Sequence, residues 1–188
     1  MCSHFLRRGV LAIAASIALL VPAIAGAQAA PRNEYEIKAA YLFTFGRFVE
    51  WPTRTAADSP FTICVLGTDP FGSTLDTLLA GATIRTRSVA ARRIATAEEV
   101  AGCHILFVSA SEARHIDPLV QSLKEAGVLT VSDMPQFAEH GGMIQFVKDA
   151  NRIRFEINLE SAREARLMLS SELLRVASAV RNGRGTPQ

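Results

Sequence analysis

Residues 61–72 read FTICVLGTDPFG, and this run has the pattern of a strand, a turn and the start of a helix. Phe61 to Leu66 is an unbroken apolar segment rich in β-branched residues, which is typical of a strand buried on both faces. Gly67-Thr68 closes the segment, and Asp69-Pro70 then resembles a helix N-cap followed by proline at the first helical position. The run therefore predicts a strand at 61–66 and a helix capped by Asp69.

The same order of elements recurs further along the chain. A second apolar strand is expected at 104–108, followed by polar residues 109–112 and a helix that runs to Glu125 and stops at Gly127. A shorter strand is expected near 88–94. The second segment therefore has the same pattern as the first, a buried strand followed by a helix.

A third strand of this kind is expected at 128–131. It ends in Ser132-Asp133, ahead of a short helix containing Phe137 and Ala138. Continuous apolar strands that alternate with helices favour a parallel sheet covered on both faces. We therefore predict an α/β fold with a mainly parallel sheet flanked by helices on both faces.

The N-terminal and C-terminal parts of the domain do not follow this alternation of strand and helix. A helix rich in aromatic residues is expected from Glu34 to Glu50, because the following Trp51-Pro52 prevents continuation, and its charged residues, Lys38 among them, are expected to face water. Segments 143–148 and 152–158 flank the turn-forming residues Asp149-Ala150-Asn151, so they predict an antiparallel C-terminal β-hairpin. A closing helix is expected from Leu159 to Arg181, packed on the sheet.

The N-terminal residues have the layout of a secretory signal. Arg7 and Arg8 precede an apolar run from Val10 to Ile24, which ends at the small residues Ala25-Gly26-Ala27. We expect a signal peptide at 1–27 with cleavage near Ala27, a single domain at 34–181 and a flexible tail at 182–188. A retained membrane anchor is the alternative, although the run contains a proline and is barely long enough to span a bilayer.

Net charge gives no support for a nucleic-acid partner. The full chain has 20 basic and 18 acidic side chains, and removing residues 1–27 takes away two arginines and no acid. The mature chain is then formally neutral, which removes any argument from net charge for a nucleic-acid or anionic-lipid surface, and no nucleic-acid partner is expected.

Two cysteines remain after the expected cleavage, because Cys2 leaves with the signal. In an oxidising compartment, Cys64 and Cys103 are expected to form a disulfide, and two buried free thiols are the alternative. Metal binding is not expected, because two cysteines with His104 beside them make a poor ligand set.

No motif for catalysis is present. The sequence has no nucleophile elbow, phosphate-binding loop, zinc-protease helix or dinucleotide fingerprint. His104, Ser109 and Asp133 have the residue types of a hydrolytic triad, but their spacing gives that interpretation no support. We therefore expect neither an enzyme nor a cofactor.

Polar residues follow each of the three expected parallel strands. Because the carboxyl ends of such strands share one edge of the sheet, where ligands commonly bind, we predict a small-molecule crevice there. Its candidate residues are Thr68, Asp69, Ser109, Ser111, Ser132 and Asp133. Ordinary helix capping explains the same residues without a ligand.

Two surfaces are candidates for binding a protein partner. Aromatic residues occupy more than one side of the first helix, so Phe43 is a possible exposed contact, with core packing as the alternative. The second hairpin arm carries Arg154 and Glu156 on its polar face, which is either a docking surface or a solvated sheet face.

Five segments, taken in order, resemble the YfiR family of bacterial periplasmic proteins, over nearly the whole mature chain. They are KAAYLFTFGRFVEWP (38–52), FTICVLGTDPFG (61–72), CHILFVSASE (103–112), LTVSDMPQFAEHGGMIQFV (129–147) and NRIRFEINLESAREARLMLSSELLRVA (151–177).

The resemblance implies a non-enzymatic regulator in the periplasm. It implies binding to the periplasmic region of an inner-membrane diguanylate cyclase and repression of it, with control of cyclic di-GMP and biofilm behaviour. It also implies an outer-membrane lipoprotein that sequesters the regulator, a homodimer, and a structural bond between Cys64 and Cys103. Some relatives have a second cysteine pair in the C-terminal half, and this chain lacks it. A periplasmic small-ligand binder remains the alternative function.

Overall fold

The computed structural model describes residues 34–51 and 59–182. These described residues belong to one compact unit. The expected signal peptide at 1–27 lies outside the described residues, as do all but the first residue of the expected tail. Within the described ranges, no helix has the length and apolar character needed to cross a membrane.

The fold contains five α-helices and two 3₁₀ helices among the described residues. They are α1 (Glu34–Phe48), α2 (Ser73–Leu79), η1 (Ala97–Val100), η2 (Ala110–His115), α3 (Ile116–Leu123), α4 (Leu159–Glu164) and α5 (Ser171–Val176). The strands are β1 (Val49–Glu50), β2 (Phe61–Leu66), β3 (Thr83–Ile84), β4 (Arg87–Ile94), β5 (Ile105–Val108), β6 (Leu129–Ser132), β7 (Ile144–Asp149), β8 (Arg152–Asn158), β9 (Met168–Leu169) and β10 (Ala179–Arg181).

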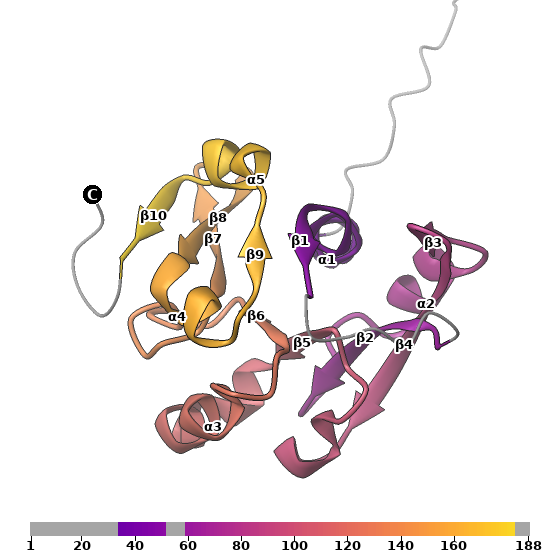
Figure 1. The fold of residues 1–188 in the computed structure, drawn as a ribbon, viewed down its shortest axis with the longest axis horizontal. Helices are drawn as coiled ribbons and strands as arrows, with labels where there is room; N and C mark the ends of the chain where they lie inside the picture. The colour runs from indigo at the N-terminus through magenta and orange to yellow at the C-terminus, as the bar shows by residue number, and fades with distance from the viewer. Residues whose placement is uncertain (1–33, 52–58, 183–188) are drawn as a thin grey trace, which may run out of the picture. The chain divides into compact units, whose positions relative to one another are not determined.

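Eight of these strands form one sheet in the order β10-β8-β7-β6-β5-β2-β4-β3 (Figure 1). The five strands from β4 to β7 run parallel, whereas β8 pairs antiparallel with β7 and β3 pairs antiparallel with β4. The predicted fold class is therefore confirmed, including the C-terminal hairpin and the short strand expected near 88–94.

Alternate residues of the central strands pack on opposite faces of the sheet. Ile63 and Phe107 belong to the core under α1 and α2, whereas Leu66 and Leu106 belong to the core under α3. Figure 1 shows α1 and α2 on one side of β2 and β5, with α3 on the other. Burial on both faces explains why these strands are apolar without interruption.

An aromatic cluster joins α1 to the hairpin. The Phe45 side chain is fully buried, and its ring lies 5.0 Å from that of Phe155 and 5.9 Å from that of Phe146, measured between centroids. Tyr41 lies 5.5 Å from the Phe155 ring and 5.8 Å from the Phe146 ring. These contacts hold the helix against the C-terminal half of the sheet.

The Cys64–Cys103 disulfide is present, with the two Cα atoms 5.8 Å apart. It joins β2 to the residues just before the neighbouring strand β5, and both cysteines are fully buried. The expected bond is therefore confirmed, and the alternative of two free thiols is wrong.

The predicted closing helix from Leu159 to Arg181 is wrong. The chain forms α4, β9, α5 and β10 in its place. Arg166 has a positive φ of 58°, which ends the first helix, and Ser170 caps the second by accepting a hydrogen bond from the Leu173 N–H at 3.2 Å. Between them, β9 pairs with β1 through Leu169 and Val49.

Two smaller helix predictions are also wrong. No helix contains Phe137 or Ala138, and the described chain forms successive turns there, with Gln136 at a positive φ of 62°. The helix after β2 starts at Ser73 and not at Pro70, because the Asp69 carboxylate accepts a hydrogen bond from the Phe71 N–H at 2.7 Å and closes a local turn first.

The disulfide gives the first testable prediction. Replacing both cysteines by alanine should lower the free energy of unfolding by about 4 kcal/mol, because the bond closes a loop over a sequence separation of 39. Urea denaturation of the mature protein measures this loss. Reductant should destabilise the wild type to a similar degree and leave the double variant unchanged, and a wild type insensitive to complete reduction would contradict the prediction.

Candidate functional site

The carboxyl ends of the central strands meet at one edge of the sheet. The register places Leu66 of β2 opposite Val108 of β5, and Val108 opposite Ser132 of β6. Of the six residues predicted to form the crevice, five therefore follow strand ends at this edge, and Ser132 is the last residue of β6. The side chains of four of the six, Asp69, Ser109, Ser111 and Ser132, however, accept hydrogen bonds there from the chain's own backbone.

Ser111 fills the space between the ends of β2 and β5. Its Oγ accepts a hydrogen bond from the Thr68 N–H at 3.0 Å and lies 3.0 Å from Oε1 of Glu112. A Cβ atom placed on Gly67, which has a positive φ of 83°, would lie only 2.3 Å from this hydroxyl oxygen. Thr68 and Ser111 are therefore brought together, but their contact occupies the predicted crevice with protein atoms.

Asp69 is held in an ion-pair cluster with Arg93 of β4. The guanidinium donates to Asp69 at 2.8 Å and to both carboxylate oxygens of Asp76 at 2.7 Å. The hydrogen bond from Arg93 lowers the pKa of Asp76 below its ordinary value. This arrangement fixes the start of α2 against the sheet.

Ser109 and Ser132 have capping roles. The Ser109 side chain accepts from the Ser111 N–H at the start of η2. Ser132 donates from its hydroxyl to the Val108 carbonyl at 2.7 Å and accepts from the Met134 N–H at 3.1 Å. Ser132 therefore turns the chain away at the end of β6.

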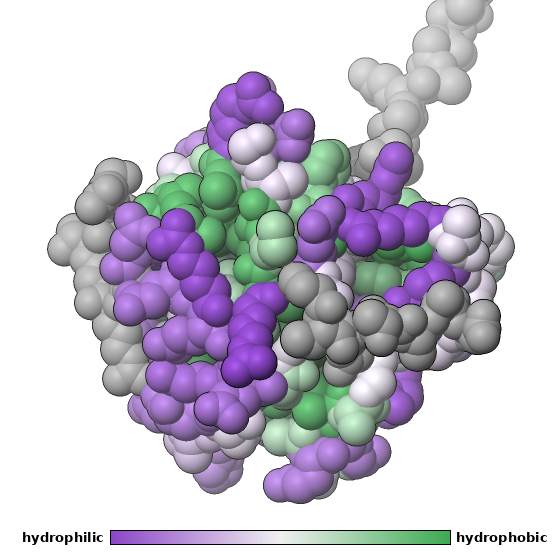
Figure 2. Space-filling model, in the orientation of Figure 1, coloured by the Kyte–Doolittle hydropathy of each residue, from purple (hydrophilic) through white to green (hydrophobic). Residues whose placement is uncertain are grey.

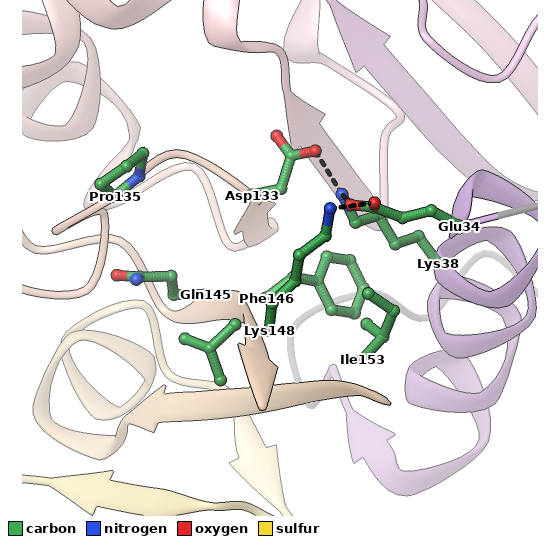
Figure 3. Close-up of a pocket in the computed structure, with 9 residues that line it drawn as sticks. Glu34, Lys38, Asp133, Pro135, Gln145, Phe146, Lys148 and Ile153 are labelled. Carbon is green, nitrogen blue, oxygen red and sulfur yellow. Dashed lines mark hydrogen bonds and ion pairs between the residues drawn. The ribbon is translucent and has the colours of Figure 1, made fainter. Parts of the chain in front are cut away.

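One of the six predicted residues, Asp133, lines a cavity. The cavity has a volume of about 390 Å³ and lies between the start of α1, the loop after β6 and the β7–β8 hairpin (Figure 3). Its lining residues are Glu34, Lys38, Asp133, Pro135, Gln145, Phe146, Val147, Lys148 and Ile153.

Four charged side chains alternate in sign along one wall of this cavity. The Lys38 Nζ lies 2.6 Å from Asp133 and 2.5 Å from Glu34, and the same Glu34 carboxylate pairs with Lys148 at 2.5 Å. The Tyr35 hydroxyl also donates to Asp133, at 3.2 Å. We call Glu34, Lys38, Asp133 and Lys148 the charge network.

The network keeps its buried member charged. Lys38 is only 2% exposed, and burial lowers its pKa, but the hydrogen bonds to Asp133 and Glu34 outweigh burial and leave the pKa above its ordinary value. Burial raises the pKa of Glu34, and the hydrogen bonds from Lys148 and Lys38 reverse this and leave it lowered. Lys38 and Glu34 are therefore held in their charged forms near neutral pH.

Lys38 corrects an expectation from the sequence, which placed this residue in water. The signal that could have indicated the network is Glu34, four residues before Lys38 on the same helix face. The other partners, Asp133 and Lys148, are about a hundred residues away in the sequence, and only the folded sheet brings them near α1.

The three predicted partner residues lie in different surroundings. Phe43 is partly buried against the main core. Glu156 accepts hydrogen bonds from Arg181 at 3.0 and 3.2 Å, so it is already paired within the sheet. Arg154 lies on the same strand, is half-buried, and is opposite Val147 of β7.

His104, Ser109 and Asp133 are not assembled into a triad. His104 lies just before β5 and Ser109 just after it, so the strand separates them. In the part of the chain that the structure describes, no group of three or more histidine, cysteine or acidic residues is arranged to hold a metal ion.

A family model described as YfiR/HmsC-like matches residues 35–178, and no curated protein matches the chain. Among solved structures, a conserved domain protein from Vibrio cholerae is similar with a TM-score of 0.53 and 10% identity, over 79% of this chain and 60% of that one. The chain thus spans about three fifths of that protein, and the likeness concerns the fold alone.

A second solved structure is an ABC domain in complex with L-Trp from Streptococcus pneumonia. Its TM-score is 0.46 at 16% identity, over 64% of this chain and 55% of that one. A likeness of this extent carries no functional argument.

The charge network gives the second testable prediction. Lys38→Met should lower the free energy of unfolding by about 3 kcal/mol, because it leaves the Asp133 carboxylate, 15% exposed, beside an apolar side chain. Lys148→Met is the matched control, because it removes a cation from the same Glu34 at an exposed position and should cost about 0.5 kcal/mol. Equal losses in urea denaturation would refute the assigned role of Lys38.

Proposed function

The chain belongs to the YfiR/HmsC-like family, and from this premise we propose that the mature protein binds the periplasmic region of an inner-membrane diguanylate cyclase and represses it. At the level of the family, the function is periplasmic, non-catalytic regulation of the diguanylate cyclase pathway. The observation that carries the proposal is the extent of the match, because residues 35–178 include nearly every helix and strand from α1 to α5.

The disulfide supports the proposed compartment. A buried bond between Cys64 and Cys103 forms and persists in an oxidising environment such as the periplasm. The signal peptide expected from residues 1–27 would deliver the chain there. Control of cyclic di-GMP, and through it of biofilm behaviour, would then be exerted from outside the compartment in which the nucleotide is made.

Repression would work as a population shift in the cyclase. A regulator that binds only from the periplasm changes activity to the extent that it binds the inactive arrangement more tightly than the active one. Each tenfold difference in affinity between the two arrangements corresponds to about 1.4 kcal/mol. An outer-membrane lipoprotein that competes for the regulator would release the cyclase, and a homodimer would present two copies of the contact.

Surface composition supports a proposed location for the contact with a protein partner. Figure 2 shows hydrophobic residues gathered on the face that carries β8, β9 and α5. Two large hydrophobic residues of the described chain are exposed. Met168 on β9 is 57% exposed, and Val176 at the end of α5 is 58% exposed. Of the predicted contacts, we retain Arg154, which is half-buried on the polar face of β8, because Phe43 packs on the core and Glu156 is paired with Arg181.

A second candidate function is binding of a small ligand. The cavity beside the charge network favours it, because about 390 Å³ lies within the usual range of ligand pockets. Of the six residues first predicted for a crevice, Asp133 lines this cavity.

The third prediction tests repression directly. Deleting the gene should raise cellular cyclic di-GMP, and expressing the wild-type protein from a plasmid should restore the original level, as measured by mass spectrometry of nucleotide extracts. The control is a strain that also lacks the partner cyclase, in which deletion should change nothing. An unchanged cyclic di-GMP level after deletion, with the cyclase expressed, would contradict the proposed function.

The fourth prediction tests the surface on β8. Arg154→Glu should weaken capture of the cyclase's purified periplasmic region by roughly tenfold, because reversing one rim charge replaces an attraction by a repulsion. Arg163→Glu, at an exposed position on α4, makes the same change of charge and is the control. Equal binding of both variants would remove Arg154 from the contact surface.

A further inference from the structure

We propose that the outer edge of β7, beyond the end of β6, is a docking site at which an extended segment of the membrane partner adds to the sheet as a short strand. This inference rests on the proposed function for the identity of the partner. The contact proposed here consists of hydrogen bonds between main chains. It therefore differs from the side-chain contacts predicted for Phe43, Arg154 and Glu156.

The strand beside β7 stops early. β6 pairs with β7 through Val131–Ile144 and Ser132–Gln145, whereas β7 continues to Asp149 and remains paired with β8 along its whole length. Among the described strands, β6 and β8 are the neighbours of β7. The outer edge of β7 therefore has no strand partner within the described chain after Ser132 ends.

The ladder shows which backbone groups this edge presents. The Asn158 N–H donates to the Met143 carbonyl at 2.8 Å, so hydrogen-bonded pairs of the hairpin recur at every second residue from Met143. Val147 accordingly pairs with β8, and the backbone groups of Phe146 and Lys148 are directed to the other side. The Ser178 N–H bond to the Phe155 carbonyl, at 2.8 Å, agrees with this alternation, because Phe155 is opposite Phe146.

Ser132 is the reason that β6 does not cover these groups. In a parallel ladder that continued by one more residue pair, the Met134 N–H would donate to the Phe146 carbonyl. It donates to the Ser132 hydroxyl at 3.1 Å instead. Three backbone groups on this edge therefore have no partner on β6: the Phe146 carbonyl, the Lys148 N–H and the Lys148 carbonyl. In this order they are an acceptor, a donor and an acceptor, which is complementary to an extended main chain.

The space needed for an added strand exists next to this edge. The cavity of about 390 Å³ is lined on one side by Phe146, Val147 and Lys148 of β7 and on the other by Asp133 and Pro135 of the loop. Figure 3 shows Gln145 and Pro135 across the cavity from the charge network. An incoming segment would place alternate side chains toward the network and toward Val147.

The charge network keeps the edge accessible. Lysine side chains on strand edges commonly prevent pairing with other chains. Here the Lys148 ammonium is drawn to Glu34 on the α1 side of the hairpin, at 2.5 Å, and Glu34 is held in turn by Lys38. The side chain is thereby tied to the helix while its backbone groups stay at the cavity.

Proline at position 148 tests the inference. Lys148→Pro removes the outward N–H and leaves the bonds to β8 intact, since residue 148 is at a non-hydrogen-bonded position of the hairpin. Lys148→Ala is the matched control, because it removes the same side chain and keeps the N–H. We expect the proline variant to bind the cyclase's purified periplasmic region about tenfold more weakly than the alanine variant.

A second measurement covers the case in which the proline variant does not fold. Amide hydrogen exchange of the Lys148 N–H in the wild-type protein should slow when the periplasmic region is added. If the wild type does not bind that region, the proposed function fails. If it binds while both variants bind equally and the Lys148 amide remains unprotected, the edge site is overturned. Protection that depends on the concentration of the regulator alone would assign the edge to a second copy and also overturn the proposal.

Discussion

A buried ammonium group is stable only when carboxylates surround it, and Lys38 has two of them within 2.6 Å. Glu34 lies one turn before Lys38 on α1, whereas Asp133 is the residue directly after β6. The requirement to keep this cation paired therefore places the start of α1 at the carboxyl edge of the sheet. The position of the cavity, the direction of the Lys148 side chain and the open edge of β7 all depend on that placement.

The aromatic contacts and the charge network secure opposite ends of the same helix. Phe45 packs between Phe146 and Phe155 in the interior, whereas Glu34 and Lys38 make their bonds at the rim. The hairpin is thus held to α1 both by apolar packing and by ion pairs. The proposed binding to a protein partner would benefit from this, because a preorganised surface loses little conformational freedom when it binds.

Local patterns were sufficient for the central strands and insufficient for the site. The runs at 61–66 and 104–108 are buried on both faces, so their apolar character is continuous and their strands could be predicted. The closing helix failed because Leu169 pairs with Val49, a residue 120 positions earlier that no local pattern identifies. Lys38 was misplaced for the same reason, since its Asp133 partner is 95 residues away. The sequence could place Asp133 at this edge because polar residues that follow parallel strands share one edge of the sheet. For Ser109 and Ser132, the structure shows capping roles, which were the alternative to a ligand crevice.

The margins of the main sheet are short. β3 has two residues and β10 has three, so neither end of the sheet offers a long row of free backbone groups to other copies of the chain. The open part of β7 is also brief and is enclosed by the loop and α1, so one added strand would fill it and leave no template for the next. A protein built in this way would take up the proposed partner segment through its backbone without starting a growing fibre.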